Sequence, residues 1–293
     1  MKKYLTMDIG GTYIKYSIMD TKYQEKNIKS IPTKENPVEF KEQLLDIVDE
    51  LKELIHGIAI SLGGFINPIT CENTDFSVGE NFTSFNLMDV LSEYSGLPVS
   101  VENDSNCAAL AEMHLGAGKE CSDFCVLTIG TGIGGAIIQD RELFRGRNFK
   151  AGEFGLCLIS KKKVKSEYFY TNAPATSDLV YRVSKALAKD VEGKYIFNNL
   201  DQPIIREIYN DWVEDIAVLV GNIALSLDPE KILIGGAVSA QEVFIKNLRD
   251  RVFGIFEHLK DYTEVEACSL GNHAGKIGAL IEFFNRYGDV EED

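Results

Sequence analysis

Short apolar runs alternate with longer amphipathic segments over nearly the whole chain. Two apolar runs, at about 3–9 and 13–20, have the length of strands and are separated by a glycine pair. Further strand-like runs are "GIAISLGG", "LPVSVEND", "KILIGG" and "VEACSL". Strands that alternate with helices predict an α/β fold, with a largely parallel or mixed sheet covered on its faces.

Helical spacing marks the segments between these strands. Asn36 and Pro37 form a helix start, after which apolar residues recur at helical intervals as far as Leu54. A glycine-closed helix is predicted over "SNCAALAEMHLGAG", and others near 176–190 and from Pro203 to about Leu227. The last two predicted helices are "AQEVFIKNLRDRVFGIFEHL" and "HAGKIGALIEFFNRYG". The stretch from about 65 to 85 is predicted to be irregular.

The second half of the chain repeats the opening of the first. "VLTIGTGIGGAIIQD" at 126–140 can be laid over "LTMDIGGTYIKYSIMD" at 5–20, which places Gly130 on Gly10 and Thr128 on Asp8. The offset between the two copies is too long for a solenoid and indicates duplicated domains. Each domain would then contribute one glycine hairpin to a shared cleft.

The glycine pair of the first hairpin has two interpretations. Gly10 and Gly11 would let the backbone take positive φ and would leave N–H groups uncovered by side chains. A tight turn needs these properties, and so does an anion site. Two neighbours favour the anion site: Asp8, an acid near the end of an apolar strand, and Thr12, a hydroxyl directly after the glycines.

The composition limits the compartment and the partners. The 293 residues suffice for two domains with separate cores, and 45 acids against 30 bases give a net charge of −15. This charge argues against nucleic acid or an anionic membrane as the main partner. The longest apolar runs are shorter than a membrane span, and the acid and glycines at 8–11 interrupt any signal-peptide core. We therefore expect a cytoplasmic protein with reduced thiols at Cys71, Cys107, Cys121, Cys125, Cys157 and Cys268.

Four motifs in order resemble the ROK family of bacterial sugar kinases, within the actin-like ATPase superfamily. They are "DIGGT" at 8–12, "VENDSNCAALAE", the second hairpin "IGTGIGGAII" and the late "ILIGGAVS". The resemblance implies two actin-like (ribonuclease H-like) α/β domains, with nucleotide and sugar in the cleft between them. The expected domains are 1–118, completed by a final helix at 274–293 that crosses back, and 119–273.

The resemblance implies ATP and Mg²⁺ at the two hairpins. Asp8 would hold Mg²⁺ directly or through water, where the metal neutralises charge on the β- and γ-phosphates. The alternative for Asp8 is a strand-end acid satisfied by neighbouring N–H groups. The nucleotide would be bound by the two hairpins and a late strand-to-helix turn, through Gly10, Gly11, Thr12, Thr131, Gly132, Gly235 and Gly236. Ordinary close packing is the alternative for the last two glycines.

Asp104 matches the family's catalytic aspartate. A sugar hydroxyl is a poor nucleophile, and a carboxylate within hydrogen-bond reach can take its proton as the hydroxyl attacks the γ-phosphate. The alternative is that Asp104 caps the helix that begins near Ser105, and both roles can hold at once.

The sugar side of the expected site is drawn from three segments. "SLGGFINP" resembles the segment that lines the family's pocket, which makes Gly64 and Asn67 candidates. Asn103 would offer a donor and an acceptor to a sugar hydroxyl, beside Asp104. "RGRNFKAGEFG" resembles the approach to the family's sugar-binding glutamate, which falls on Glu153. The alternative for Glu153 is a solvated acid in a loop.

One departure from the family separates this chain from most ROK kinases. Those proteins follow the Gly-Glu-x-Gly segment with a histidine and a cysteine cluster that binds structural zinc. Here Leu156 stands at the histidine position and Cys157 is the only cysteine nearby. One thiol cannot form a tetrahedral zinc site, so we predict no zinc. This suits the zinc-less branch, with its β-glucoside kinases and proteins assigned as N-acetylmannosamine kinases, and the missing histidine would leave room around the sugar's C1.

The expected function is ATP-dependent phosphorylation of a hexose, at O6, on glucose, N-acetylmannosamine or a β-glucoside. One alternative is a non-catalytic sugar sensor or regulator of the same family, against which Asp8 and Asp104 argue. The family's repressors carry a DNA-binding segment ahead of the glycine hairpin, for which the position of Asp8 leaves no space. A homodimer is expected from the family. "KKKVK" at 161–165 and the acidic end "GDVEED" are predicted to be solvated.

Overall fold

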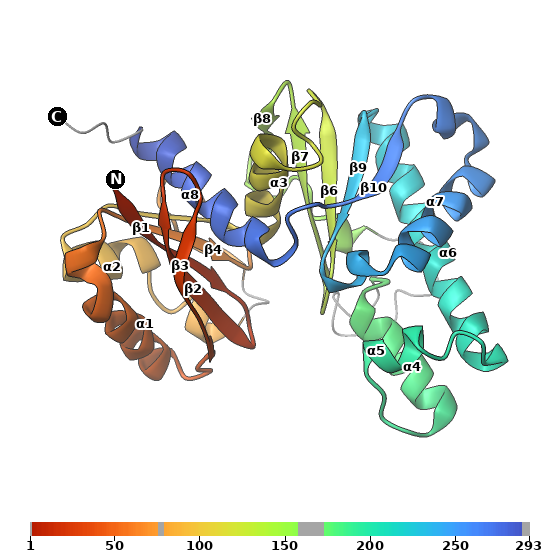
Figure 1. The fold of residues 1–293 in the computed structure, drawn as a ribbon, viewed down its shortest axis with the longest axis horizontal. Helices are drawn as coiled ribbons and strands as arrows, with labels where there is room; N and C mark the ends of the chain where they lie inside the picture. The colour runs from red at the N-terminus through yellow and green to blue at the C-terminus, as the bar shows by residue number, and fades with distance from the viewer. Residues whose placement is uncertain (1, 76–78, 158–172, 289–293) are drawn as a thin grey trace. The chain divides into compact units, whose positions relative to one another are not determined.

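The computed structural model describes residues 2–75, 79–157 and 173–288 (Figure 1). It divides into two compact units, and within the described residues each unit is built around a five-stranded sheet. Unit 1 contains the described residues through His114, the short segment Arg145–Ala151 and the residues from His273 onward. Unit 2 contains Leu115–Phe144 and Gly152–Asn272.

The sheet of unit 1 has the strand order β3-β2-β1-β4-β5. β1 is antiparallel to β2 and parallel to β4, and β4 is parallel to β5. The strands are β1 (Lys3–Ile9), β2 (Tyr13–Asp20), β3 (Glu25–Pro32), β4 (Ile58–Leu62) and β5 (Val99–Asn103). The helices are α1 (Pro37–Leu51), α2 (Leu87–Ser95), α3 (Asp104–Leu115) and α8 (Ala274–Tyr287).

The two faces of this sheet carry different side chains. Leu5, Met7 and Ile60 point to one face and are fully buried in an apolar core with residues of α1 and α2. The opposite face carries small polar groups, among them Thr6 and Ser17, whose hydroxyl oxygens lie 3.0 Å apart. Strand residues alternate between faces, so the period of two assigns one face to the apolar core and the other to polar contacts.

Helix α8 packs on the face that bears these polar groups, against β1, β4 and β5. Near its start, the ammonium of Lys276 donates to Glu25 at 2.8 Å and to Ser17 at 3.2 Å, with both charged side chains buried. Near its end, the ring of Phe283 lies 5.2 Å from that of Tyr4, centroid to centroid. Both ends of α8 are therefore attached to the opening strands.

Local sequence explains where the helices of unit 1 begin. The side-chain oxygen of Asn36 accepts the N–H groups of Val38 and Glu39, and Pro37 follows at the first helical position. Asn86 caps α2 in the same way. Helix α2 ends at Gly96, whose φ of +72° closes the helix in the left-handed region.

Unit 2 has the strand order β10-β9-β6-β7-β8. Its strands are β6 (Phe124–Ile129), β7 (Ile133–Gln139), β8 (Glu142–Leu143), β9 (Lys231–Gly235) and β10 (Glu264–Ala267). Its helices are α4 (Thr176–Leu187), α5 (Gly193–Phe197), α6 (Pro203–Leu227) and α7 (Glu242–Ile255). Trp212 of α6 is fully buried, and its indole N–H donates to the carbonyl of Ala175, just before α4.

Several elements differ from the sequence-based prediction. Strand β3 and helices α2 and α5 were absent from it, and β3 is an edge strand whose residues are mostly exposed. The segment Arg145–Ala151 belongs to unit 1, although the residues on either side belong to unit 2. None of the helices in the described part of the chain has the length and apolar character of a membrane span. The predictions for 161–165 and for 289–293 lie outside the described residues.

Candidate functional site

Unit 1 gathers several of the predicted site residues at one edge of its sheet. The carboxyl ends of the parallel strands β1, β4 and β5 meet there, and the register pairs Asp8 of β1 with Ser61 of β4. Asn103 is the last residue of β5, Asp104 is the first residue of α3, and Gly64 follows β4 by two residues. Ligands of open α/β sheets bind outside the carboxyl ends of the strands. This edge is the candidate site of unit 1.

Asp8 is a partly buried carboxylate with few neutralising contacts. The hydroxyl of Ser61 donates to its Oδ1 at 3.0 Å, and a Cβ added at Gly275, in the first turn of α8, would lie 3.0 Å from the same oxygen. Burial raises the pKa of Asp8, while the Ser61 bond and the charges of Lys15 and Lys276 act in the opposite direction. A hard cation would relieve this desolvated negative charge, so the group fits a role in holding Mg²⁺.

Asp104 stands at the amino end of α3 and keeps access to solvent. Its Oδ1 accepts the backbone N–H of Ser105 at 2.7 Å and the Ser105 hydroxyl at 3.3 Å. Desolvation by the surrounding protein raises the pKa of the Asp104 carboxyl, and the negative charge of Asp8 raises it further. Of the two roles considered for Asp104, the capping role falls to Asn103 instead, whose side chain accepts the N–H groups of Ser105 and Asn106. The Ser105 contacts involve one oxygen of Asp104, and its role as a base stays a prediction.

The Asn103 side chain makes the main capping contacts of α3. Its Oδ1 accepts the N–H groups of Ser105 at 2.9 Å and Asn106 at 3.0 Å, and its Nδ2 donates to the carbonyl of Gly64 at 2.9 Å. Gly64 has a φ of +115°, and a Cβ there would lie 2.5 Å from the amide of Asn73. The turn after β5 and the loop after β4 are therefore joined by one side chain.

Asn67 lies three residues after Gly64, and its side chain makes local contacts. Its side-chain oxygen accepts the N–H of Ile69 at 2.9 Å and that of Thr70 at 3.4 Å. These bonds hold the loop that continues to Glu72, where the backbone N–H of Asn67 finds its acceptor at 2.9 Å. The contacts assign Asn67 to the shape of this loop, and a sugar contact remains a prediction.

The first glycine hairpin has a different backbone conformation from the one expected from its sequence. Gly10 and Gly11 have no positive φ, so the expected left-handed turn is wrong. The turn is instead held by Thr33, the residue directly after β3, which donates its N–H to the Thr12 carbonyl at 3.0 Å and its hydroxyl to the Gly10 carbonyl at 2.7 Å. A Cβ at Gly11 would meet nothing within 4 Å. The glycines therefore leave the turn uncovered rather than permitting its backbone angles.

The second glycine hairpin lies at the carboxyl end of β6, in unit 2. Its turn is one residue shorter than the first, because Ile129 pairs with Ile133 whereas Ile9 pairs with Ile14. Helix α4 begins on this turn, where the N–H of Thr176 donates to the carbonyl of Gly130 at 3.0 Å.

A side chain of α4 also contacts this turn at the amino end of the helix. The hydroxyl of Ser177 donates to the carbonyl of Thr131 at 2.6 Å, and Ala175, the residue before the helix, offers no capping side chain. The helix predicted near 176–190 corresponds to α4, but its start was not named as a site residue, because an alanine at the cap gives no signal.

Gly235 and Gly236 stand at the carboxyl end of β9, beside β6. Gly235 pairs with Thr128, which places both glycines at the same edge as the turn of residues 130–132. Gly236 has a φ of +87°, and a Cβ there would lie 2.2 Å from the carbonyl oxygen of Ile129. Close packing therefore accounts for Gly236, while its position at the strand edge leaves the nucleotide role open as a prediction.

Glu153 is fixed by glycines packed against β7. A Cβ at Gly152 would lie 2.7 Å from the carbonyl of Gly135, and one at Gly155 would lie 2.1 Å from that of Ile133. Glu153 precedes a short 3₁₀ turn, η3 (Phe154–Leu156), and its side chain is half-buried. The glycines on either side of Glu153 thus allow the backbone to lie directly on the sheet of unit 2.

The position of the family's zinc cluster is only partly described. Leu156 ends η3 and Cys157 is exposed, while residues 158–172 lie outside the described part of the chain. Among the described residues, no three His, Cys, Asp or Glu side chains are grouped as metal ligands would be. The prediction of no zinc stays a prediction.

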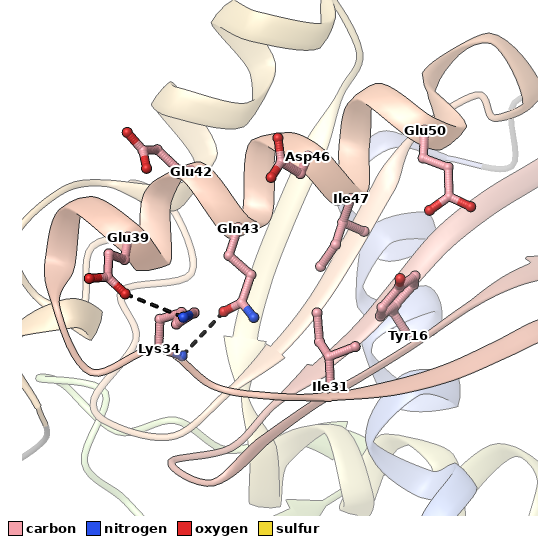
Figure 2. A pocket seen from close by; sticks show the side chains of 9 residues that line it. All are labelled: Tyr16, Ile31, Lys34, Glu39, Glu42, Gln43, Asp46, Ile47 and Glu50. Carbon is pink, nitrogen blue, oxygen red and sulfur yellow. Dashed lines mark hydrogen bonds and ion pairs between the residues drawn. The ribbon is translucent and has the colours of Figure 1, made fainter.

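A surface hollow of about 440 Å³ lies elsewhere on unit 1, between α1 and strands β2 and β3 (Figure 2). The main chain of Lys34 donates to Gln43 at 3.2 Å, and its ammonium pairs with Glu39 at 3.4 Å. Four carboxylates line the hollow, and they would repel a phosphorylated ligand: Glu39, Glu42, Asp46 and Glu50. None of the predicted site residues lines it, so this hollow is not the candidate site.

Mixed α/β sheets of this topology, with an acid at the end of the first strand and glycine turns in both units, define an actin-like ATPase fold. The ROK family model matches residues 4–284, and the chain belongs to the ROK family.

Relatives of known name match the chain over nearly its full length. A β-glucoside kinase of Listeria innocua is 35% identical, with 96% of this chain and 97% of that protein covered. A β-glucoside kinase of Klebsiella pneumoniae is 33% identical, with 99% of both chains covered. The solved structure of a ROK family protein from Streptococcus pneumoniae, in complex with sucrose, is 30% identical with a TM-score of 0.85, covering 97% of this chain and 99% of that one.

Proposed function

We propose that this protein transfers the γ-phosphate of ATP to a hexose hydroxyl, O6, with a β-glucoside as the favoured acceptor and glucose and N-acetylmannosamine as further candidates. The protein is an ATP-dependent sugar kinase by its family and by the kinases it matches over nearly its full length. One observation carries the mechanism: Asp104 and Asp8 stand at the same edge of one sheet, close enough for the charge of Asp8 to raise the pKa of Asp104.

Asp104 is proposed as the general base. Its Oδ1 is held by Ser105, which fixes the orientation of the carboxylate while the second oxygen can accept the proton of the attacking hydroxyl. A raised pKa makes the carboxylate a stronger base than an unperturbed aspartate. It must be ionised to act, so the reaction rate is expected to rise with pH through this pKa, above 3.8.

Asp8 is proposed to hold Mg²⁺, directly or through water. When bound, the ion would neutralise charge on the β- and γ-phosphates. The Ser61 hydroxyl fixes one oxygen of Asp8. The Gly10 N–H is used within the turn, where it donates to the Tyr13 carbonyl at 3.0 Å, whereas a Cβ at Gly11 would meet nothing within 4 Å. Gly10, Gly11 and Thr12 are proposed to face the phosphates beside this carboxylate.

In unit 2, the nucleotide is proposed to contact Thr131 and Gly132 of the turn after β6, with Gly235 and Gly236 beside it. A Cβ at Gly132 would meet nothing within 4 Å, so the backbone there is uncovered. The amino end of α4 meets the same turn, and helix amino ends favour negative charge. On the sugar side, Gly64, Asn67, Asn103 and Glu153 are proposed contacts.

The choice of a β-glucoside rests on two supports. The relatives at 33–35% identity that act on a named substrate are β-glucoside kinases. In addition, Leu156 stands where most ROK kinases have a histidine, which removes a polar group that would contact the sugar near C1 and C2. A substituent on O1 then meets fewer fixed polar partners.

A coupled ADP-release assay tests the function. Wild-type enzyme is expected to release ADP with cellobiose or an aryl β-glucoside, and more slowly with glucose, mannose or N-acetylmannosamine. Asp104→Asn is expected to lower kcat by about 10² to 10⁴-fold, because the amide cannot accept the proton. Asp89→Asn, at an exposed position in the first turn of α2, is the matched control and should retain activity.

Two results would count against the proposal. If no sugar raises ADP release above the level of Asp104→Asn, the protein is not a sugar kinase. Sugar binding by calorimetry without ADP release would identify a sensor instead.

A further inference from the structure

A buried cluster of three charges joins remote parts of unit 1. The guanidinium of Arg145 donates to Oε2 of Glu102 through Nε at 2.9 Å and Nη2 at 2.7 Å, and Nη2 also meets Glu282 at 2.8 Å. Glu102 lies on β5 with its side chain 1% exposed, and Glu282 lies on α8 with 12% exposed. Two largely buried carboxylates therefore share one cation whose side chain is 22% exposed.

The other oxygen of Glu102 is bound to the turn that carries Asp104. Oε1 accepts the backbone N–H of Asn103 at 2.7 Å and the side-chain Nδ2 of Asn106 at 2.9 Å. These two donors lie on either side of Asp104 in the sequence. The position of Asp104 thus depends on the orientation of one buried carboxylate, and Arg145 fixes that orientation from the opposite oxygen.

Arg145 comes from a segment that leaves unit 2 and returns to it. Phe144 and Gly152 belong to unit 2, whereas residues 145–151 belong to unit 1. The segment closes on itself, with the Ala151 N–H donating to the Arg145 carbonyl at 3.2 Å. Lys150 lies over the ring of Phe65, its ammonium 4.7 Å from the centroid. Glu153, the predicted sugar ligand, follows two residues after the segment ends.

We propose that Glu102 and Arg145 are positioning residues for phosphoryl transfer. Glu102 holds the turn that bears Asp104, and Arg145 attaches the segment that leads to Glu153 to that same carboxylate. The pair would then set the orientation of Asp104 and the point at which the segment leading to Glu153 is attached to unit 1. This inference rests on the proposed sugar-kinase function.

The geometry explains why arginine is needed at residue 145. Three N–H···O contacts to two carboxylates need a planar fork of donors, which a guanidinium has and an ammonium lacks. Lysine would keep the charge but could not hold Glu102 in a two-point contact and reach Glu282 as well. Arg145→Lys is therefore the conservative variant that removes orientation while leaving the charge in place.

Steady-state kinetics of Arg145→Lys and Glu102→Gln test the proposal. Misplacing a reacting group by about 1 Å costs on the order of 10²-fold, so kcat is expected to fall by up to that factor. The KM for the sugar should rise and the KM for ATP should stay unchanged. The double variant should be no slower than the worse single variant, because the two side chains act through one contact.

Arg182 offers a matched control in unit 2. Its guanidinium also bridges two carboxylates, Asp178 at 2.5 Å and Asp215 at 3.1 Å, and it is 26% exposed against 22% for Arg145. Arg182→Lys removes a similar ion pair far from β5 in the sequence. We expect it to lower the melting temperature without changing kcat or either KM.

Amide hydrogen exchange separates this inference from the proposed function. In Arg145→Lys, the N–H groups of residues 103–106 should lose protection, while in Arg182→Lys they should keep it. Unchanged protection at 103–106 would overturn the positioning role. So would a fall in kcat with both KM values constant, because that is the result expected when part of the enzyme is unfolded. Lost protection in a protein that phosphorylates no sugar would instead overturn the proposed function alone.

Discussion

At the scale of single residues, the environment of Asp8 decides its chemistry. Burial raises its pKa, and the hydroxyl of Ser61 is the first of the groups that counter this effect. A carboxylate that holds a cation must be ionised, so each group that lowers its pKa also favours the metal. Ser61 is therefore part of the proposed metal site through its bond to Asp8.

Replacing Ser61 by alanine tests this dependence. The pKa of Asp8 should rise further, so the ionised fraction at a given pH falls and Mg²⁺ competes with a proton. The Mg²⁺ concentration for half-maximal activity is expected to increase about tenfold, equivalent to about 1.4 kcal/mol. The increase should be larger in acidic than in alkaline buffer, which a titration with Mg²⁺ at several pH values would measure.

Ser100 is the control for this substitution. It is buried on β5, and its hydroxyl has no hydrogen-bond partner within the described residues. Ser100→Ala should leave the Mg²⁺ requirement unchanged at every pH. A Ser61→Ala enzyme with the wild-type Mg²⁺ requirement would mean that Asp8 does not hold the metal.

At the scale of elements, the sequence predicted those with a strong periodic pattern. The span Pro203–Leu227 matches α6 at both ends, because a proline start and an apolar stripe persist through it. Strand β3 was missed since an exposed edge strand lacks alternating apolar residues. The motif around Asp8 and Asp104 could be found from local residues, but the Arg145 cluster could not. Its members are separated by dozens of residues and meet only through the fold.

The crossing of α8 and α3 gives an element-scale prediction. A Cβ at Gly278 would lie 1.8 Å from the carbonyl oxygen of Cys107, so α8 approaches the backbone of α3 directly. Gly278→Ala gains helix propensity but must separate the two helices, and overpacking of this kind costs about 1–3 kcal/mol. The free energy of unfolding from denaturant titration should therefore decrease.

Gly254 of α7 is the matched control for Gly278. It is also a helical glycine, and a Cβ there would meet nothing within 4 Å. Gly254→Ala should stabilise the protein by up to about 1 kcal/mol, since alanine loses less backbone entropy than glycine. Equal effects of the two substitutions would show that the helix crossing does not limit the residue at 278.

At the scale of the whole molecule, unit 1 is discontinuous in the sequence. Its sheet is formed by residues before 104, and the helix that covers one face comes from residues 274–287. The domain limits predicted from the sequence, at 118 and 274, stay a prediction. The structure divides into units at 114/115 and at 272/273, and no local feature of the sequence indicates that residues 145–151 belong to unit 1. The cleft expected between the domains stays a prediction.

Ending the chain after Asn272 tests the dependence of unit 1 on α8. The truncated protein loses the contact of Lys276 with Glu25 and that of Phe283 with Tyr4. Amides of β1 and β4 should then exchange rapidly, while those of β6 and β9 in unit 2 stay protected. Full protection of β1 and β4 in the truncated chain would contradict this.

Because α8 lies near the end of the chain, it is synthesised long after the strands that it covers. Translation at about 5–20 residues per second leaves roughly 10 to 40 s between the end of β5 and the end of α8. During this interval the strands of unit 1 exist without the helix that covers Tyr4 and Ser17, while all of unit 2 is made. The second unit of the sequence can thus finish folding before the first, and the first is the one that a chaperone would need to shield.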